Sequence, residues 1–158
     1  MVKILKVTLH LRLIFIPIEK ITTTEDAQVS IIWQQKLPET NMRISTLMSY
    51  SGGFKEAVAE IKALEKAGLD VVWVPEAYSF DAPTAMGYLA AETERVIIAS
   101  GILPIYTRTP SLLAMTAAGL DYLSDGRAML GLGASGPQVI EGFHGVPYNA
   151  PVARTREV

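Results

Sequence analysis

From residue 42 onward, short apolar runs alternate with segments whose apolar residues recur every three or four positions. The short runs predict strands, and those at 71–74 and 96–99 are apolar throughout, as strands buried on both faces are. The longer segments predict helices with one buried stripe each. The predicted strands are residues 43–48, 71–74, 96–99 and 128–132. The predicted helices run from Phe54 to a glycine cap at Gly68, from Asp81 to about Glu92, and from about Pro110 to Leu123.

The ends of these helices carry recognisable signals. Asp81 stands two residues before Pro83, and Thr109 directly before Pro110, so each can cap a helix that has proline in its first turn. Strands and helices then alternate, and right-handed crossovers between them give a parallel sheet covered by helices. Two α/β architectures fit this pattern: an open doubly wound sheet, or about four βα units forming the N-terminal half of an eight-stranded (β/α)8 TIM barrel. Periodicity alone leaves both open.

Residues 1–41 lack this regularity. The apolar stretch at 1–18 is interrupted by charged residues and by Pro17, so it is too broken to span a membrane. No small-residue cleavage site follows it, which argues against a signal peptide. Residues 19–41 are polar, irregular and rich in turn formers. We therefore expect a poorly ordered N-terminal extension at 1–41, with Met42 as the natural start, and one domain at 42–158.

Composition narrows the function classes. Hydrophobic residues make up 49% of the 158 residues, which supports a folded core, and the net charge of −2 gives no reason to expect nucleic acid or an anionic membrane as partner. The chain has no cysteine, which excludes disulfides and thiolate chemistry and fits a cytoplasmic protein. Its two histidines, His10 and His144, have no ligand-like spacing, so no metal site is expected.

Candidate chemistry gathers where the predicted strands end. Ser100 and Gly101 break the third strand, and α/β proteins bind ligands in loops at this end of the sheet. Glu76 follows the second strand and could serve in acid–base chemistry, although a solvated loop carboxylate is the commoner case. Tyr78 and Tyr106 could stack on a planar ligand or simply pack. Arg108 could meet an anionic group, but a single surface arginine usually faces solvent.

A glycine-rich stretch follows the fourth strand. Gly131-x-Gly133-x-x-Gly136 matches the dinucleotide-binding pattern formally, but those glycines belong after the first strand, with an acidic residue about 20 positions later. The match is therefore weak. Ser135 could cap a short helix that has Pro137 in its first turn, and such a helix start can bind phosphate or a polar ring edge. An ordinary capped turn explains the same residues equally well.

Taken in order, five segments resemble the luciferase-like monooxygenase superfamily, specifically its branch of oxidoreductases that use the deazaflavin coenzyme F420. The resemblance covers everything after the extension. Together the segments are specific, whereas no single one is. The matching segments are residues 68–76, 99–104, 109–110, 123–127 and 131–145.

The resemblance implies a (β/α)8 barrel with the cofactor at the C-terminal ends of the strands. Such barrels need about 250 residues, so the chain resembles the N-terminal half of a longer enzyme. Relatives carry a non-proline cis peptide at the end of strand three that backs the deazaflavin ring, and Gly101-Ile102 is the matching position. Glu76 matches the acidic position after strand two in these relatives, so the resemblance implies that it is the catalytic candidate. The cofactor-binding candidates are Ser100, Gly101, Ile102, Gly133, Ser135 and Gly136.

The resemblance implies hydride transfer between coenzyme F420 and a small organic substrate, with an FMN-dependent monooxygenase as the nearest alternative. Relatives often have histidine beside the acidic residue, whereas this chain has Ala77 and Tyr78, which leaves a histidine-based proton transfer there unsupported. Half a barrel exposes two unpaired strand edges. We therefore expect a homo-oligomer or pairing with a C-terminal half-barrel. A non-catalytic fragment and a nucleotide-binding α/β module are the remaining alternatives.

Overall fold

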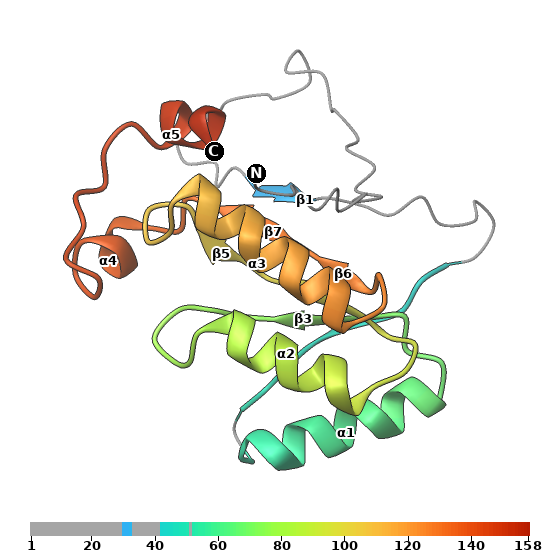
Figure 1. Cartoon of the computed structure of the whole chain (residues 1–158). Coiled ribbons are helices and arrows are strands. Elements are labelled where there is room, and N and C mark those ends of the chain that lie inside the picture. The colour runs from blue at the N-terminus through green and yellow to red at the C-terminus, as the bar shows by residue number, and fades with distance from the viewer. Residues whose placement is uncertain (1–29, 33–41, 51) are drawn as a thin grey trace, which may run out of the picture.

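The computed structural model describes residues 42–50 and 52–158, together with the backbone of residues 30–32 (Figure 1). Strands and helices alternate through it as the hydrophobic pattern predicts. The strands are β1 (Ser30–Ile32), β2 (Ser45–Leu47), β3 (Val71–Val74), β4 (Ile97–Ser100), β5 (Leu103–Pro104), β6 (Ala128–Met129) and β7 (Gly131–Gly133). The helices are α1 (Phe54–Lys66), α2 (Ala82–Glu92), α3 (Pro110–Leu123), α4 (Pro137–Ile140) and α5 (Pro151–Glu157).

Sheet order decides between the two architectures. β2, β3, β4 and β6 are parallel neighbours in the order in which they occur along the chain. A doubly wound sheet reverses its strand order at a switch point, whereas a barrel places each strand beside its predecessor. The half-barrel prediction is therefore confirmed over the described strands, and the open doubly wound sheet is excluded for them.

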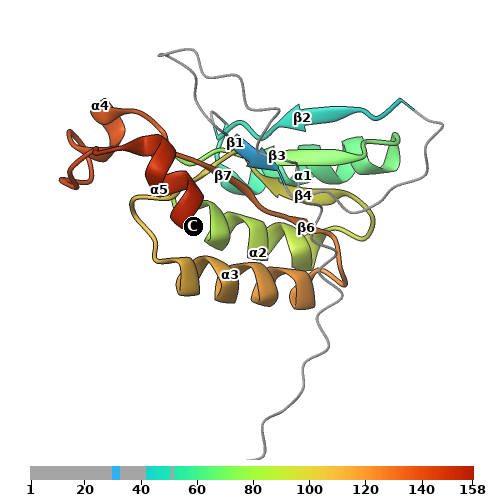
Figure 2. The same ribbon diagram turned by 90° about the horizontal axis from the view of Figure 1, so that it is seen from above.

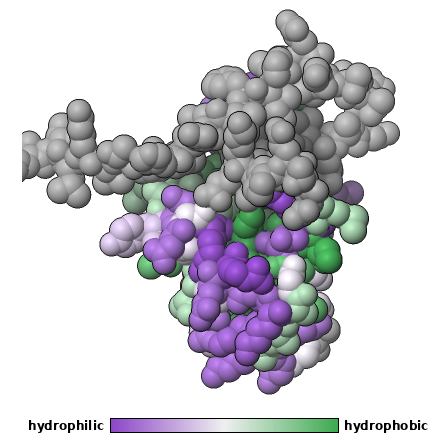
Figure 3. Space-filling view, turned by 90° about the vertical axis from the view of Figure 1, so that its right-hand side faces the viewer, coloured by the Kyte–Doolittle hydropathy of each residue, from purple (hydrophilic) through white to green (hydrophobic). Residues whose placement is uncertain are grey.

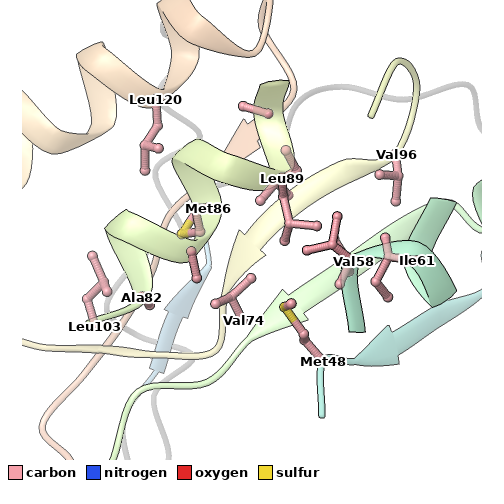
Figure 4. Close-up of a cluster of buried hydrophobic side chains, with 14 of the residues drawn as sticks. Met48, Val58, Ile61, Val74, Ala82, Met86, Leu89, Val96, Leu103 and Leu120 are labelled. Carbon is pink, nitrogen blue, oxygen red and sulfur yellow. The ribbon is translucent and has the colours of Figure 1, made fainter. Parts of the chain in front are cut away.

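Helices α1, α2 and α3 cover one face of this sheet (Figure 2). Val72, Val74 and Ile98 of β3 and β4 belong to the main buried cluster together with Met86 and Leu89 of α2. Figure 4 shows Val74 of β3 beside the α2 residues Met86 and Leu89 in the layer between sheet and helices. All five side chains are at most 1% exposed. Because side chains alternate along a strand, the intervening residues form a second, smaller cluster on the opposite face. Its members are Val71, Trp73, Ile97, Ala99 and Met129.

Both proline-containing helix starts are confirmed. The Asp81 carboxylate accepts the backbone N–H of Thr84 at 3.1 Å, and the Thr109 hydroxyl accepts that of Leu112 at 3.2 Å. Gly68, placed just after the α1 cap residue, has φ +105°, a conformation that favours glycine. These local signals need no tertiary contact, which explains why the sequence predicts them well.

Glu65, which is buried, and Arg127, which is half-buried, fasten the end of the sheet at which the helices lead into the strands. One carboxylate oxygen of Glu65 accepts three consecutive backbone N–H groups, those of Glu94, Arg95 and Val96. Burial raises the pKa of Glu65, but these three hydrogen bonds and the charge of Arg127 together bring it below its ordinary value. Figure 3 faces this end, and most of its coloured surface is hydrophilic, with smaller hydrophobic areas.

Arg127 binds backbone carbonyl groups at the same end of the sheet, as Glu65 binds backbone N–H groups. Its guanidinium donates hydrogen bonds of 2.8–3.1 Å to the carbonyl oxygens of Ala90, Thr93, Val96 and Ser124. The segment 123–127, one of those that carry the family resemblance, is thus explained structurally. Arginine supplies enough donors in one rigid group to join the end of α2, the end of α3 and the start of strand three.

Counted along the barrel, β2 is strand one, β3 is strand two, β4 with β5 is strand three, and β6 with β7 is strand four. Strands three and four are each interrupted, and the sequence did not predict the interruption of strand four. β4 and β5 are separated by Gly101 and Ile102, and β6 and β7 by Leu130. β4 pairs with β6 and β5 with β7, so the two interruptions lie side by side. The expected single strand at 128–132 is therefore wrong in detail, because strand four must follow the bulge of its neighbour.

The extension predicted at 1–41 lies mostly outside the described residues. Within it, β1 pairs antiparallel with β7, Ile31 opposite Leu132. One of the two strand edges expected to be unpaired therefore has a partner from residues 30–32. Among the described residues, no helix has both the length and the apolar character needed to cross a membrane.

Candidate functional site

The cis peptide expected at Gly101-Ile102 is present. It lies between β4 and β5, at the C-terminal end of strand three, and we call Gly101-Ile102 the bulge. Both residues of the bulge are half-buried, whereas Ser100 before it and Leu103 after it are fully buried. The bulge is therefore the exposed part of an otherwise enclosed segment.

Ser100 holds the bulge against strand four. Its hydroxyl donates to the carbonyl oxygen of Gly131 at 2.9 Å and accepts the N–H of the same residue at 2.9 Å. With 0% exposure, its side chain has no free capacity for a ligand. Its cofactor-binding role stays a prediction, and the geometry supports a role in holding the backbone that would contact a cofactor.

The glycines of strand four make room for the bulge rather than for a dinucleotide. A Cβ on Gly131 would lie 2.2 Å from the carbonyl oxygen of Ser100, which no side chain can tolerate. A Cβ on Gly133 would lie 3.2 Å from the side chain of Ile102. Ile102 thus occupies the space that these glycines leave, and the glycine spacing has a packing cause.

The loop after strand four differs from the predicted capped turn. Gly136, not Ser135, is the N-cap residue of α4, so no side chain caps this helix. Ser135 instead has φ +59°, and its carbonyl oxygen accepts the Tyr148 hydroxyl at 3.0 Å. The prediction of a Ser135 cap is wrong, because the left-handed turn at Ser135 moves the helix start one residue along the chain. Ser135 and Gly136 remain half-exposed beside the end of strand four.

Glu76 is not a solvated loop carboxylate. Its side chain is 8% exposed, and both of its oxygens are engaged by Arg108, at 2.5 Å and 2.8 Å. One of them also accepts the N–H of Ala82 at 2.7 Å, at the start of α2. The common expectation for Arg108, a solvent-facing side chain, is likewise wrong, since only 12% of it is exposed. This pair joins the loops that follow strands two and three.

Sequence reasoning missed one polar group at this end of the sheet. Tyr50 follows β2, and its buried hydroxyl has no hydrogen-bond partner among the described residues. Burial raises the pKa of Tyr50, and the negative charges of Glu76 and Asp81 raise it further. No sequence pattern marks Tyr50, because its setting depends on loops that meet only in the fold.

The candidate residues come together at one end of the half-barrel, where the strands end and the loops leading to α2, α3 and α4 begin (Figure 1). The structure brings the bulge into contact with Gly133, and it places Glu76 beside Arg108. It does not bring Glu76 into a hydrogen bond with any cofactor-binding candidate. This end of the half-barrel therefore carries two separate features: the apolar surface of the bulge, and the Glu76–Arg108 ion pair.

The family model for luciferase-like monooxygenases matches residues 40–158. The chain belongs to this family. Its topology, its bulge and its glycine-rich fourth strand agree with that assignment.

Curated relatives include coenzyme F420 enzymes. A proposed coenzyme F420-dependent oxidoreductase of Mycobacterium tuberculosis is 40% identical over 121 residues, which cover 75% of this chain and 35% of the relative. The 5,10-methylenetetrahydromethanopterin reductase of Methanolobus tindarius is 32% identical over 97 residues, covering 61% of this chain and 29% of the relative. The chain thus spans about a third of the length of the curated relatives it matches.

Solved structures show the same fold. The coenzyme F420-dependent tetrahydromethanopterin reductase of Methanopyrus kandleri superposes with a TM-score of 0.64 at 24% identity, over 76% of this chain and 38% of that one. The oxygenating constituent of 3,6-diketocamphane monooxygenase of Pseudomonas putida, in complex with FMN, gives 0.65 at 17% identity, over 74% and 38%. At these identities the likeness establishes the fold, and it is equally strong for both cofactor classes.

Proposed function

We propose that this chain forms the cofactor-facing half of an oxidoreductase that transfers a hydride between coenzyme F420 and a small organic substrate. The observation that carries the proposal is the bulge, half-exposed at the C-terminal end of strand three. Of the relatives reported above, the one with the highest identity to this chain is a proposed F420-dependent oxidoreductase. This similarity favours the deazaflavin over FMN as the cofactor.

The residues around the bulge fit a flat ring. Ile102 is anchored because its side chain fills the space above Gly133. Gly101 lies close to Trp73, since a Cβ built on Gly101 would be 3.4 Å from the Cβ of Trp73. Ser100 ties the start of the bulge to strand four, because its hydroxyl both donates to and accepts from the backbone of Gly131. An apolar surface fixed in this way can support one face of a ring and exclude water from it.

The deazaflavin, when bound, supplies the hydride chemistry. The bulge would hold the ring, and Ser135 with Gly136 would border it from strand four. Glu76 would act through position rather than by exchanging a proton, because both of its oxygens already accept hydrogen bonds from Arg108 and Ala82. The ion pair keeps the loop after strand two in place beside the cofactor.

The partner and the location of the protein also remain proposals. We expect a small-molecule substrate in the cytoplasm, and association either as a homo-oligomer or with a C-terminal half-barrel. α3 supports association, since Leu112, Met115, Tyr122 and Leu123 expose between 46% and 85% of their surface. Exposed apolar area of this kind on one helix is typical of contact surfaces.

A fluorescence titration with coenzyme F420 and, separately, with FMN tests the function, with solution mass measured on the same sample. We expect micromolar binding of F420 and binding of FMN at least tenfold weaker. The variant Gly133→Val should weaken F420 binding, because its side chain would displace Ile102, whereas Gly119→Ala in α3 should not. Preferential FMN binding would favour the monooxygenase alternative, and no binding by the folded chain would overturn the cofactor site.

A further inference from the structure

We propose that Tyr78, Phe143 and His144 form a ring-binding corner that takes a planar aromatic or heteroaromatic group of the substrate. This inference rests on the proposed function, whose cofactor would lie at the bulge. The corner is built by two loops 65 positions apart in the sequence, one after strand two and one after α4. Both loops lie at the end of the sheet where strand three presents its bulge (Figure 1).

The three rings meet edge to face. Tyr78 and Phe143 have ring centroids 5.6 Å apart at 82°, and Phe143 and His144 are 4.9 Å apart at 75°. In this geometry one ring presents its edge to its neighbour, so the faces are not stacked on one another. Tyr78 is 62% and Phe143 54% exposed. Exposed ring faces set at nearly right angles offer a flat ligand one face to stack on and one edge to contact.

The other aromatic pair at this end has a structural explanation. The ring centroids of Tyr106 and Tyr148 lie 5.1 Å apart, and both rings pack against the main core. The Tyr106 hydroxyl donates to the carbonyl oxygen of Asn149, and the Tyr148 hydroxyl donates to that of Ser135. These two tyrosines hold the C-terminal segment on strands three and four. Tyr78 and Phe143 do not belong to either buried cluster, so core packing does not account for them.

Hydrogen bonds anchor the backbone on both sides of the corner. The backbone N–H groups of Phe143 and His144 both donate to the carbonyl oxygen of Val139, at 3.2 Å and 3.0 Å. Gly142 lets this turn close, since a Cβ there would lie 2.5 Å from the carbonyl oxygen of Gln138. On the other side, Tyr78 is two residues from Glu76, which Arg108 fixes. A backbone that is anchored before binding loses less chain entropy when a ligand arrives.

The chemistry of the corner defines the class of ligand. Two carbocyclic rings favour a flat, uncharged ring system, and the imidazole of His144 adds a nitrogen that can form a hydrogen bond with a heteroatom. The ligand could be the substrate or the cofactor ring itself. We assign the corner to the substrate because the neighbours found for the bulge are Trp73 of strand two and Gly131 and Gly133 of strand four, none of which belongs to the corner.

Binding of 2-naphthamide and its saturated decahydro analogue to the full chain, followed by ligand NMR, tests the proposal. The two probes share the amide and differ in ring flatness. We expect the naphthamide to bind at least tenfold tighter. Tyr78→Ala and Phe143→Ala should each weaken it about fivefold to tenfold, and Tyr78→Phe should not. Tyr88→Ala, which removes another exposed tyrosine, on α2, is the matched control and should have no effect on naphthamide binding.

Titration of the same variants with coenzyme F420 separates the two sources of the ring. Affinity for F420 should stay within twofold in Tyr78→Ala and Phe143→Ala. Equal affinity for both probes, or no effect of the two alanine variants, would overturn the corner. Parallel loss of F420 binding, or competition between F420 and naphthamide, would assign the corner to the cofactor instead. Naphthamide binding without any F420 or FMN binding would mean that the proposed function has failed and would overturn the substrate assignment.

Discussion

Arg108 and Glu76 lie side by side although 32 positions separate them, with Nη1 2.5 Å from Oε1 and Nη2 2.8 Å from Oε2. Both side chains are nearly buried, at 12% and 8% exposure. A two-pronged contact of this kind fixes the orientation of both groups. It connects the loop after strand two with the loop after strand three, immediately before α3 begins.

Breaking this pair should be costly. Arg108→Met leaves the Glu76 carboxylate buried without its counter-charge, and we expect a loss of about 3 kcal/mol in the free energy of unfolding, measured with urea. Glu76→Gln alone should cost a comparable amount. The double variant should recover a large part of the loss, because it removes both charges. If the two single effects simply add, the pair is not coupled and the interpretation is wrong.

Removal of the Ser100 hydroxyl should loosen the bulge. Ser100→Ala leaves the N–H of Gly131 buried without its partner, which costs about 1–3 kcal/mol in unfolding free energy. Affinity for F420 should fall as well, because the bulge loses its tie to strand four. Ser124→Ala is a matched control, since Ser124 is equally buried, at 1% exposure, but follows α3 at the end of the sheet away from the bulge. It should lower stability without a specific effect on F420 affinity.

Substitutions of three glycines should rank by the space around them. Gly131→Ala places a Cβ 2.2 Å from a backbone oxygen, so we expect a loss of about 3 kcal/mol or more, or failure to fold. Gly133→Ala meets only the side chain of Ile102, which can shift, so its cost should be smaller. Gly119→Ala has open space in α3 and should stabilise the protein by about 0.5–1 kcal/mol. Thermal unfolding of the three variants gives the order, and an unaffected Gly131→Ala would contradict the described contact between strands three and four.

Glu65 should make stability depend on pH in the acid range. Burial opposes its charge, but three backbone hydrogen bonds and Arg127 lower its pKa below the ordinary 4.5. A lowered pKa in the folded state means that the stabilisation is complete above the unfolded-state value and is lost as pH falls through the folded-state value. Urea unfolding between pH 7 and pH 2.5 should therefore show a steeper acid loss in the wild type than in Glu65→Gln.

The glutamine variant also supplies the control for that measurement. It keeps an acceptor oxygen but no charge, so near pH 7 it should be less stable than the wild type by about 1.5–3 kcal/mol, the range for hydrogen bonds to charged groups. The difference between the two proteins should shrink as the pH falls below about 4.5. A difference that stays constant with pH would show that Glu65 contributes through packing rather than charge.

Local sequence patterns predicted most of the helices and strands and the order in which they occur. Apolar periodicity predicted β3 and the three long helices, and Asp81 and Thr109 predicted where two of those helices begin. These features depend on residues close together in the chain, since a cap or an amphipathic stripe forms within a few residues. The family resemblance supplied the half-barrel and the bulge at Gly101-Ile102, which periodicity could not.

The interactions of the loop residues, in contrast, depend on tertiary contacts. Glu76 is an acid–base candidate in the sequence and half of a closed ion pair in the fold, because Arg108 reaches it from the next βα loop. The contact between Ser100 and Gly131 also depends on the fold, since it forms where the bulge of strand three lies beside the break in strand four. Contacts between segments about 30 positions apart leave no periodic pattern, and they arise when parallel strands align their C-terminal ends at one edge.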